Sequence, residues 1–311
     1  MHIGEVGYRN RPFDGEKDFW RVRGLLIGTY SLTPPGFNWD IRHWDGWFFH
    51  REHPSWSARR LDLIHLWETQ EGRLIGAVHP EGEGYACLQV HPDHRHIERA
   101  MITWAEDHIA VPGNDDGKRV LHFSVFEYDS LRRRLLESLG YDKTSRSVKL
   151  YRMRFGNRLL PCPNMPKGFV LRTTCANDQG DCEKLADVLN AAFNRNFHTA
   201  KEIQTFVAMS PSHRHDLELA AEERSGSSIA FVGVTYDEAN RIGIFEPVGT
   251  HPDHRRKGLT RTLMLEGMKR LAALGATDAY VGTGDAVPAN RLYEAVGFTE
   301  VYEGHIWRKV F

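Results

Sequence analysis

A five-residue segment occurs twice in this chain. His-Pro-Asp-His-Arg stands at 91–95 and again at 251–255, a shift of 160 residues. The ends of the two halves also correspond, because the triplet Leu-Gly-Tyr at 139–141 is matched by Val-Gly-Phe at 296–298. A repeat of this length is the size of a whole domain, which is large enough to bury its own core. We therefore predict two copies of one fold in tandem.

The boundary between the copies is predicted from a proline-rich stretch. Residues 156–168 read GNRLLPCPNMPKG and follow neither the helical nor the strand period. Closely spaced prolines stiffen a connection. The predicted domains are therefore 1–155 and 168–311, joined by a linker at 156–167.

The second half contains a strand, a basic turn and a helix in direct succession. An extended run at 242–250 leads into the repeated turn, and a helical pattern begins at Leu259. The first N–H groups of a helix lack partners within the helix and carry a partial positive charge, so they attract anions. Gly258 permits close approach to the backbone, and Arg255, Arg256 and Lys257 add positive charge. This order of elements predicts an anion site.

Two motifs in the second half resemble signatures of the GNAT N-acetyltransferases. The family's acyl-CoA loop, Gln/Arg-x-x-Gly-x-Gly/Ala, is matched by Arg255 and Gly258, whereas Thr260 departs from the small third residue. A second signature is matched downstream, in the right order and with one helix and one strand between the two. Its matching residues are Asn290, Leu292, Tyr293, Gly297 and Phe298.

The resemblance implies both a fold and an activity. Each half should be an α/β (α+β) domain with a mixed, mostly antiparallel central sheet flanked by helices. The activity implied is acyl transfer from acetyl-CoA, as cosubstrate, to a primary amine, catalysed by the second half. In this family Tyr293 would be the general acid for the departing sulfur, and Asn290 would contact the pantetheine or fix its helix. The other residues expected to bind the coenzyme are Val248, Gly249, Thr250, Arg255, Arg256, Lys257, Gly258, Leu259 and Thr260, with 282–284 on the opposite wall.

The general base is less well defined by the sequence. Glu246 shares strand parity with Val248 and Thr250, so the three side chains fall on one face. Glu246 is our candidate base, with a solvated or salt-bridged strand glutamate as the alternative. His251, a chain of water molecules or the terminal carboxylate at Phe311 could also accept the proton.

The first half lacks the residues that carry this chemistry. At the same shift Glu98 replaces Gly258, so a carboxylate is directed toward the position of the pyrophosphate. Leu136 and Arg133 replace Tyr293 and Asn290. We predict a degenerate domain that serves as a structural partner, with binding of acceptor or of a second ligand as the alternative. A tandem with one degenerate half is similar to the architecture of mycothiol synthases.

Composition restricts the setting and the partners. The net charge is −1, so neither a nucleic acid nor a membrane surface is expected as partner. Four cysteines without a Cys-x-x-Cys pair, no signal peptide and no long apolar run predict a reduced, cytoplasmic protein. The paired histidines lack metal-site spacing, so no metal is expected.

The acceptor is predicted to be a small-molecule amine rather than a protein, and the oligomeric state is left open. The competing function is a non-catalytic acyl-CoA-binding, regulatory or scaffold protein, which would not need Tyr293.

Three local patterns carry further predictions. Thr199 followed by Glu202 predicts a capping box at the start of a helix. Residues 300–302 and 306–310 are predicted to form a hairpin around Gly304. The aromatic residues at 39–49 are interpreted as core or as a domain contact, with a ligand box as the alternative.

Overall fold

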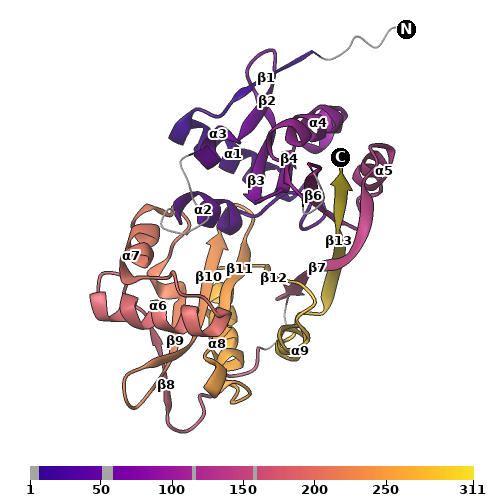
Figure 1. The fold of residues 1–311 in the computed structure, drawn as a ribbon. Coiled ribbons are helices and arrows are strands. Elements are labelled where there is room, and N and C mark those ends of the chain that lie inside the picture. The colour runs from indigo at the N-terminus through magenta and orange to yellow at the C-terminus, as the bar shows by residue number, and fades with distance from the viewer. Residues whose placement is uncertain (1–6, 51–58, 114–116, 157–159) are drawn as a thin grey trace. The chain divides into compact units, whose positions relative to one another are not determined.

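The computed structural model describes residues 7–50, 59–113, 117–156 and 160–311, which form two compact units (Figure 1). Unit 1 takes its described residues from 1–41, 57–148 and 302–311, and unit 2 takes its own from 42–56 and 149–301. The domains predicted from the sequence are contiguous. The units of the structure instead exchange segments, since 42–56 belongs to unit 2 and 302–311 to unit 1.

Unit 1 is built on a sheet whose strands follow the order β1-β2-β3-β4-β6-β13. All of these neighbours are antiparallel except β4 and β6, which are parallel. The first part of β7 (Asp142–Arg154) also belongs to this unit. The strands are β1 (Tyr8–Pro12), β2 (His65–Thr69), β3 (Leu74–Gly82), β4 (Tyr85–Val90), β5 (Val111–Pro112), β6 (Arg119–Phe126) and β13 (Glu300–Val310), and the helices are α1 (Gly15–Tyr30), α3 (Arg59–Asp62), η1 (Pro92–Ile97), α4 (Glu98–His108) and α5 (Ser130–Ser138).

Unit 2 has a sheet in the order β12-β11-β10-β9-β8, with the second half of β7 against β12. Only β11 and β12 are parallel within this order. Both units therefore confirm the predicted fold class of mixed, mostly antiparallel sheets flanked by helices. The elements are α2 (Ile41–Phe49), β8 (Phe169–Thr173), α6 (Gln179–Phe193), α7 (Ala200–Met209), η2 (His215–Leu217), β9 (Glu218–Glu223), β10 (Ser228–Asp237), β11 (Ile242–Thr250), η3 (Pro252–His254), α8 (Leu259–Ala273), β12 (Asp278–Thr283) and α9 (Val287–Val296).

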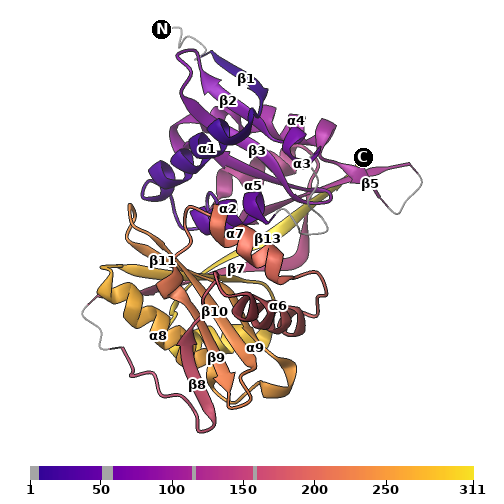
Figure 2. The same ribbon diagram turned by 90° about the vertical axis from the view of Figure 1, so that its left-hand side faces the viewer.

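The alternation of side chains along β9 and β10 gives unit 2 two apolar faces. Ala220 and Phe231 pack with α6 and α7, while their neighbours Ala230 and Val232 pack with α8 (Figure 2). Successive side chains of a strand point to opposite faces, so both faces of this sheet are covered by helices. Such a double layer buries the middle of the sheet and leaves the strand ends for chemistry.

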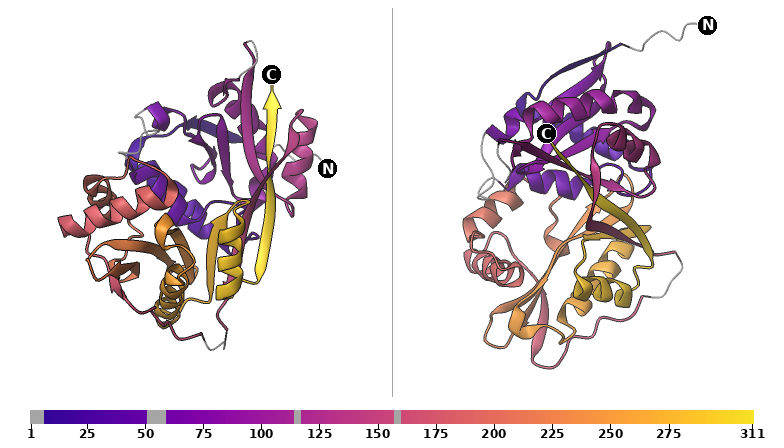
Figure 3. Two further views of the ribbon diagram at one scale, coloured as in Figure 1. Left: turned by 60° about the horizontal axis from the view of Figure 1, so that its bottom comes forward. Right: turned by 45° about the vertical axis from the view of Figure 1, so that its right-hand side comes forward.

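The predicted hairpin around Gly304 is wrong, because β13 is one unbroken strand of 11 residues (Figure 3). Gly304 pairs with Phe126 at the first position of the ladder between β13 and β6, within the strand. A Cβ at Gly304 would lie 2.8 Å from the carbonyl oxygen of Val125 and 2.9 Å from the Cα of Phe126. This glycine therefore serves a close approach between strands rather than a turn. Its strand pairs with β6 and so adds the C-terminus of the chain to the sheet of unit 1.

The predicted capping box is only half formed. Thr199 Oγ1 accepts a hydrogen bond from the backbone N–H of Glu202 at 3.1 Å. The carboxylate of Glu202 is hydrogen-bonded to two histidines instead of returning to the N-cap. Four of the aromatic side chains at 39–49 are buried, in agreement with the core interpretation: Trp44, Trp47, Phe48 and Phe49.

Candidate active site

Strands β11 and β12 of unit 2 pair at three positions and then separate. The paired residues run from Ile242 opposite Asp278 to Ile244 opposite Tyr280. Beyond them β11 continues to Thr250 and β12 to Thr283 without a register between them. The backbone of β11 that faces this gap has lost its neighbour, which leaves an edge able to bind an extended ligand.

A bulge in β11 lies where the separation begins. The register with β10 shifts between Val232 and Val234, so that two β11 residues, Glu246 and Pro247, stand opposite Gly233. A bulge bends its strand. A Cβ at Gly233 would lie 2.8 Å from the carbonyl oxygen of Glu246, and glycine therefore allows this approach. The predicted coenzyme contacts Val248, Gly249 and Thr250 lie on the separated segment, directly after the bulge.

The turn between β11 and α8 presents backbone N–H groups at a helix start. Gly258 is the N-cap of α8 with φ +79°, and no side chain caps the helix there. Space around its Cα is open, since an added Cβ would meet nothing within 4 Å. His251 Nδ1 accepts from the N–H of Asp253 at 3.3 Å, and the repeat makes the same bond from Asp93 to His91. The repeated motif is therefore a turn-forming device.

The basic residues of this turn have different surroundings. Arg255 donates to the carbonyl of Ala192 at 3.1 Å, and Lys257 lies 5.8 Å from the ring of Phe169. Arg256 is exposed, has φ 63°, and has no hydrogen bond or ion pair with the described part of the chain. Its guanidinium is therefore available for an anion at the start of α8.

The side chains that follow Gly258 serve the fold. Leu259 is a core residue, and the hydroxyl of buried Thr260 is hydrogen-bonded to that of Thr250. The departure from the family's small third residue thus places a threonine side chain against β11. Only the backbone N–H groups of these two residues remain for a ligand.

Tyr293 on α9 is almost fully buried, and its ring packs against other aromatic rings. The residue is 5% exposed and meets Tyr151 and Phe298 edge-on at 5.8 and 6.1 Å between ring centroids. Its hydroxyl has no hydrogen-bond partner within the described ranges. Burial, with a smaller contribution from Tyr151, raises the pKa of Tyr293 to about 12. The hydroxyl therefore stays protonated at neutral pH and keeps its proton for a ligand.

Asn290 lies one helical turn before Tyr293 and has an unpaired hydrogen-bond acceptor. Its Nδ2 donates to the carbonyl of Gly284 at 3.4 Å, which ties α9 to the preceding loop. Its Oδ1 is buried without a partner among the residues the structure describes. Leaving such an acceptor unpaired costs about 1–3 kcal/mol. A ligand amide N–H would remove that cost.

The candidate bases do not come together in one place. Glu246 is half-buried at the bulge, and its backbone carbonyl accepts from Arg42 Nε at 3.3 Å. The ring of His251 is engaged in the turn, and Phe311 pairs through its backbone with Arg119 in unit 1. Sequence reasoning missed a cluster on α2 and α7 near Glu246, formed by Arg42, His50, His198, Glu202 and Phe206. The signal was the pair Thr199 and Glu202, interpreted only as a cap.

The corresponding position in unit 1 is filled by the protein itself. Glu98 is fully buried at the start of α4, where it accepts from Arg95 at 2.5 Å and from Arg132 at 2.9 Å. Both guanidinium groups also lie about 5 Å from the ring of Phe37, at 4.9 and 5.1 Å. The carboxylate thus binds two cations of its own unit, and its charge is balanced there.

The strand edge of unit 1 is also occupied. Strands β4 and β6 pair only through Tyr85 and His122, so they separate as β11 and β12 do. The side chain of Asn38 then bonds both backbone groups of Val90, donating to the carbonyl at 3.0 Å and accepting from the N–H at 2.9 Å. Gln89 accepts from the N–H of Trp39 at 2.8 Å. An extended ligand would have to displace these bonds.

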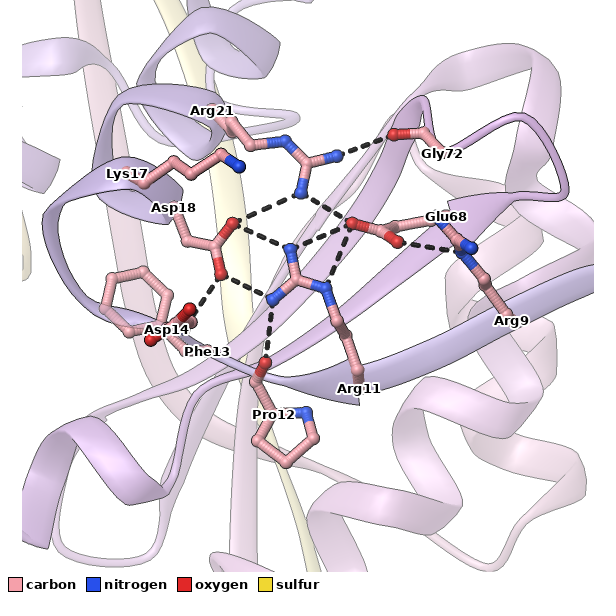
Figure 4. Close-up of a pocket in the computed structure, with 10 residues that line it drawn as sticks. All are labelled: Arg9, Arg11, Pro12, Phe13, Asp14, Lys17, Asp18, Arg21, Glu68 and Gly72. Atoms are coloured by element: carbon pink, nitrogen blue, oxygen red, sulfur yellow. Dashed lines mark hydrogen bonds and ion pairs between the residues drawn. The ribbon is translucent and has the colours of Figure 1, made fainter.

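A separate cavity of about 660 Å³ in unit 1 is lined by charged side chains (Figure 4). Glu68 accepts from Arg9, Arg11 and Arg21, while Asp18 accepts from Arg11 and Arg21. Both carboxylates are almost fully buried. The network joins β1, α1 and β2, and its guanidinium groups are already bound. We interpret it as a structural network.

Replacing Glu68 by Gln is expected to destabilise unit 1 by about 2 kcal/mol, because three partly exposed guanidinium groups lose the buried carboxylate that accepts their hydrogen bonds. Although burial opposes ionisation, hydrogen bonds from Arg21 and Arg11 lower the pKa of Glu68. Its stabilisation is therefore present above its unfolded pKa of about 4.3 and is lost as the pH falls through the folded value. Denaturant unfolding measures the effect, with Asp216→Asn, an exposed pair with Arg214, as control. Equal losses in the two variants would contradict a buried network.

Comparison with known proteins finds similarity to GNAT acetyltransferases, the family that the two sequence motifs resemble. The acetyltransferase (GNAT) family model matches residues 183–298. A tandem GNAT protein from the clavulanic acid biosynthesis pathway aligns with a TM-score of 0.68 and 15% identity over 98% of both chains. A GCN5-related N-acetyltransferase from Sphaerobacter thermophilus aligns with a TM-score of 0.65 and 17% identity, over 97% of this chain and 95% of that one. A GNAT-family acetyltransferase from Colwellia psychrerythraea aligns with a TM-score of 0.60 and 12% identity, over 97% of this chain and 100% of that one. No curated protein matches the sequence.

Residues 183–298 are an acetyltransferase domain of the GNAT family, and the chain has the fold of a tandem GNAT protein. The family uses acetyl-CoA as cosubstrate, which supports acyl-CoA-dependent N-acyltransferase activity. None of the described helices is long and apolar enough to cross a membrane. Within the same ranges, no group of three or more His, Cys, Asp and Glu side chains is arranged to hold a metal ion.

Proposed function

We propose that unit 2 transfers an acetyl group from acetyl-CoA to a primary amine of a small molecule. The observation that carries this proposal is the separation of β11 from β12, together with Tyr293 on α9, the helix that packs against β12, whose hydroxyl has no hydrogen-bond partner among the described residues. A protein that only bound acyl-CoA would need the strand edge and the start of α8, but not this hydroxyl. Bound acetyl-CoA supplies the thioester whose acyl group is transferred.

The chain's own residues fit the parts of such a cosubstrate. The uncapped N–H groups at Gly258, Leu259 and Thr260, with Arg256 nearby, suit the pyrophosphate. The free edge at Val248–Thr250 and the unpaired Oδ1 of Asn290 suit the amides of the pantetheine. The remaining cations, Arg255 and Lys257, lie in the same turn and add to its positive potential.

Tyr293 is suited to relay a proton. Its pKa of about 12 is higher than that of a thiol, about 8.5, so a free phenolate would not persist beside a thiol. We therefore expect Tyr293 to donate its proton to the departing sulfur while it receives one from the nitrogen that has attacked the carbonyl carbon. The hydroxyl is therefore protonated both before and after the step.

The proposal is tested by following the release of free CoA. Purified full-length protein is supplied with acetyl-CoA and, one at a time, with spermidine, glucosamine, lysine and histamine. Amine-dependent release together with a mass increase of the amine by one acetyl group is expected. Binding of acetyl-CoA without release of CoA for any primary amine would favour the non-catalytic alternative.

A further inference from the structure

A buried carboxylate joins two histidines in unit 2. Glu202 Oε1 lies 2.5 Å from His50 Nδ1, and its Oε2 lies 3.1 Å from His198 Nδ1. Although burial opposes ionisation, the hydrogen bonds from His198 and His50 lower the pKa of Glu202 to about 2. An ionised carboxylate only accepts hydrogen bonds. Both imidazoles therefore carry a proton on Nδ1, so Nε2 is the nitrogen of each ring left for another partner.

The two histidines differ in what their Nε2 atoms meet. His198 is 9% exposed as a side chain, and its Nε2 lies 3.5 Å from a guanidinium nitrogen of Arg195. The His50 side chain is 28% exposed, and its ring stacks on Phe206 at 4.0 Å with an interplanar angle of 5°. No described residue bonds its Nε2. His50 is thus an imidazole oriented through Nδ1, and its Nε2 is without a partner in the described part of the chain.

The cluster is anchored to the bulge of β11. Arg42, two turns before His50 on α2, places its guanidinium 4.9 Å from the same Phe206 ring. Its Nε donates to the carbonyl of Glu246 at 3.3 Å. Gly46 lies between them on the helix face, where a Cβ would contact both Arg42 Nη1 and His50 Cδ2. The imidazole is therefore linked, through the side chains of Phe206 and Arg42, to the bulge of β11.

We propose that His50 is the general base of the acetyl transfer and that Glu202 is its positioning residue. The inference rests on the proposed function. His50 Nε2 takes one proton from the acceptor's ammonium group, which frees the nitrogen lone pair. The nitrogen then forms a bond to the thioester carbon, and the carbon–sulfur bond breaks. The second proton of the nitrogen passes through Tyr293 to sulfur, and the imidazolium returns its proton to solvent.

The charged groups around His50 set the pH at which it acts. Burial lowers the pKa of His50, Glu202 opposes this through its hydrogen bond, and Arg42 and His198 lower it further. The base is therefore neutral at neutral pH, and activity should fall on the acid side as His50 takes up a proton. Since Glu202 raises the pKa of His50, Glu202→Gln should move this acid limb of kcat/KM to lower pH while lowering its plateau.

The experiment compares His50→Gln, Glu202→Gln and the control His215→Gln in the full-length chain, because His215 is exposed in η2. The acceptor is whichever of the four amines above gives the fastest release of CoA. For His50→Gln we expect kcat to fall about 100-fold, in the range for loss of a general base, with acetyl-CoA affinity unchanged. The control should retain wild-type rates and the wild-type pH profile.

A second readout does not depend on turnover. Nitrogen NMR of the imidazoles in the protein without acetyl-CoA should show His50 protonated on Nδ1, and Glu202→Gln should abolish that preference. Wild-type kcat in His50→Gln, an unmoved acid limb in Glu202→Gln, or an Nε2-protonated His50 would each overturn the inference. Failure of the wild type to acetylate any of the four amines would instead remove the proposed function and this inference with it.

Discussion

Gly258→Glu is expected to abolish measurable binding of acetyl-CoA to unit 2. The substitution copies Glu98 of unit 1 and directs a carboxylate at the start of α8. Two like charges about 4 Å apart near a protein surface repel by about 4 kcal/mol, which corresponds to a loss of affinity of about 1000-fold. A carboxylate is favourable at a helix N-terminus, so the helix itself should survive.

Gly258→Ala separates charge from backbone conformation. Gly258 has φ +79°, and a side chain in the left-handed region costs about 1–2 kcal/mol. An added Cβ would meet no atom within 4 Å, so no further clash is expected. Titration calorimetry should therefore find binding weakened by the alanine and lost with the glutamate. Wild-type affinity in Gly258→Glu would show that the pyrophosphate does not bind at this turn.

Tyr293→Phe is expected to lower kcat by about 100-fold, the lower end of the range for loss of an acid–base group. The ring remains in its contacts with Tyr151 and Phe298, and the lost hydroxyl has no protein partner in the described ranges, so stability and acetyl-CoA affinity should not change. Tyr236→Phe is the matched control. Its hydroxyl donates to the carbonyl of Leu274 at 3.1 Å, away from the separated strands.

The two kinetic constants distinguish the possible roles of Tyr293. A loss confined to kcat indicates proton transfer in the reacting complex, whereas a rise in KM alone would indicate a binding contact. Unchanged kcat and KM in Tyr293→Phe would exclude the hydroxyl from the chemistry and favour the acyl-CoA-binding alternative.

The sequence predicted those parts of the fold that are encoded locally. The strand, turn and helix at 242–273 follow from hydrophobic period and a glycine at a position with positive φ, and the structure has them where expected. The prediction of a hairpin around Gly304 was wrong because this glycine allows close pairing with β6, a strand from the first half of the chain. A local sequence pattern does not indicate a partner so distant in the chain. The assignment of 42–56 to unit 2 and of 302–311 to unit 1 could not be predicted either, because it also depends on contacts between residues far apart in the chain.

The sequence predicted some residues of the candidate site and missed others, because only some of them lie in continuous motifs. Tyr293, Asn290 and the turn at 255–258 lie in continuous motifs, so a sequence pattern could find them. The pair formed by His50 and Glu202 joins residues 152 positions apart, and each alone resembles an ordinary helix residue. The filling of the unit 1 strand edge by Asn38 is likewise a tertiary contact. The sequence predicts a degenerate first unit only from the local replacements Glu98, Leu136 and Arg133.

The central claim is that this tandem protein has one acetyl-CoA site, in unit 2. Titration calorimetry of acetyl-CoA into the intact chain measures it through stoichiometry. We expect one site per chain, because Glu98 and Asn38 satisfy within unit 1 the groups that a coenzyme would need. Two sites per chain, or one site that survives Gly258→Glu, would contradict the account.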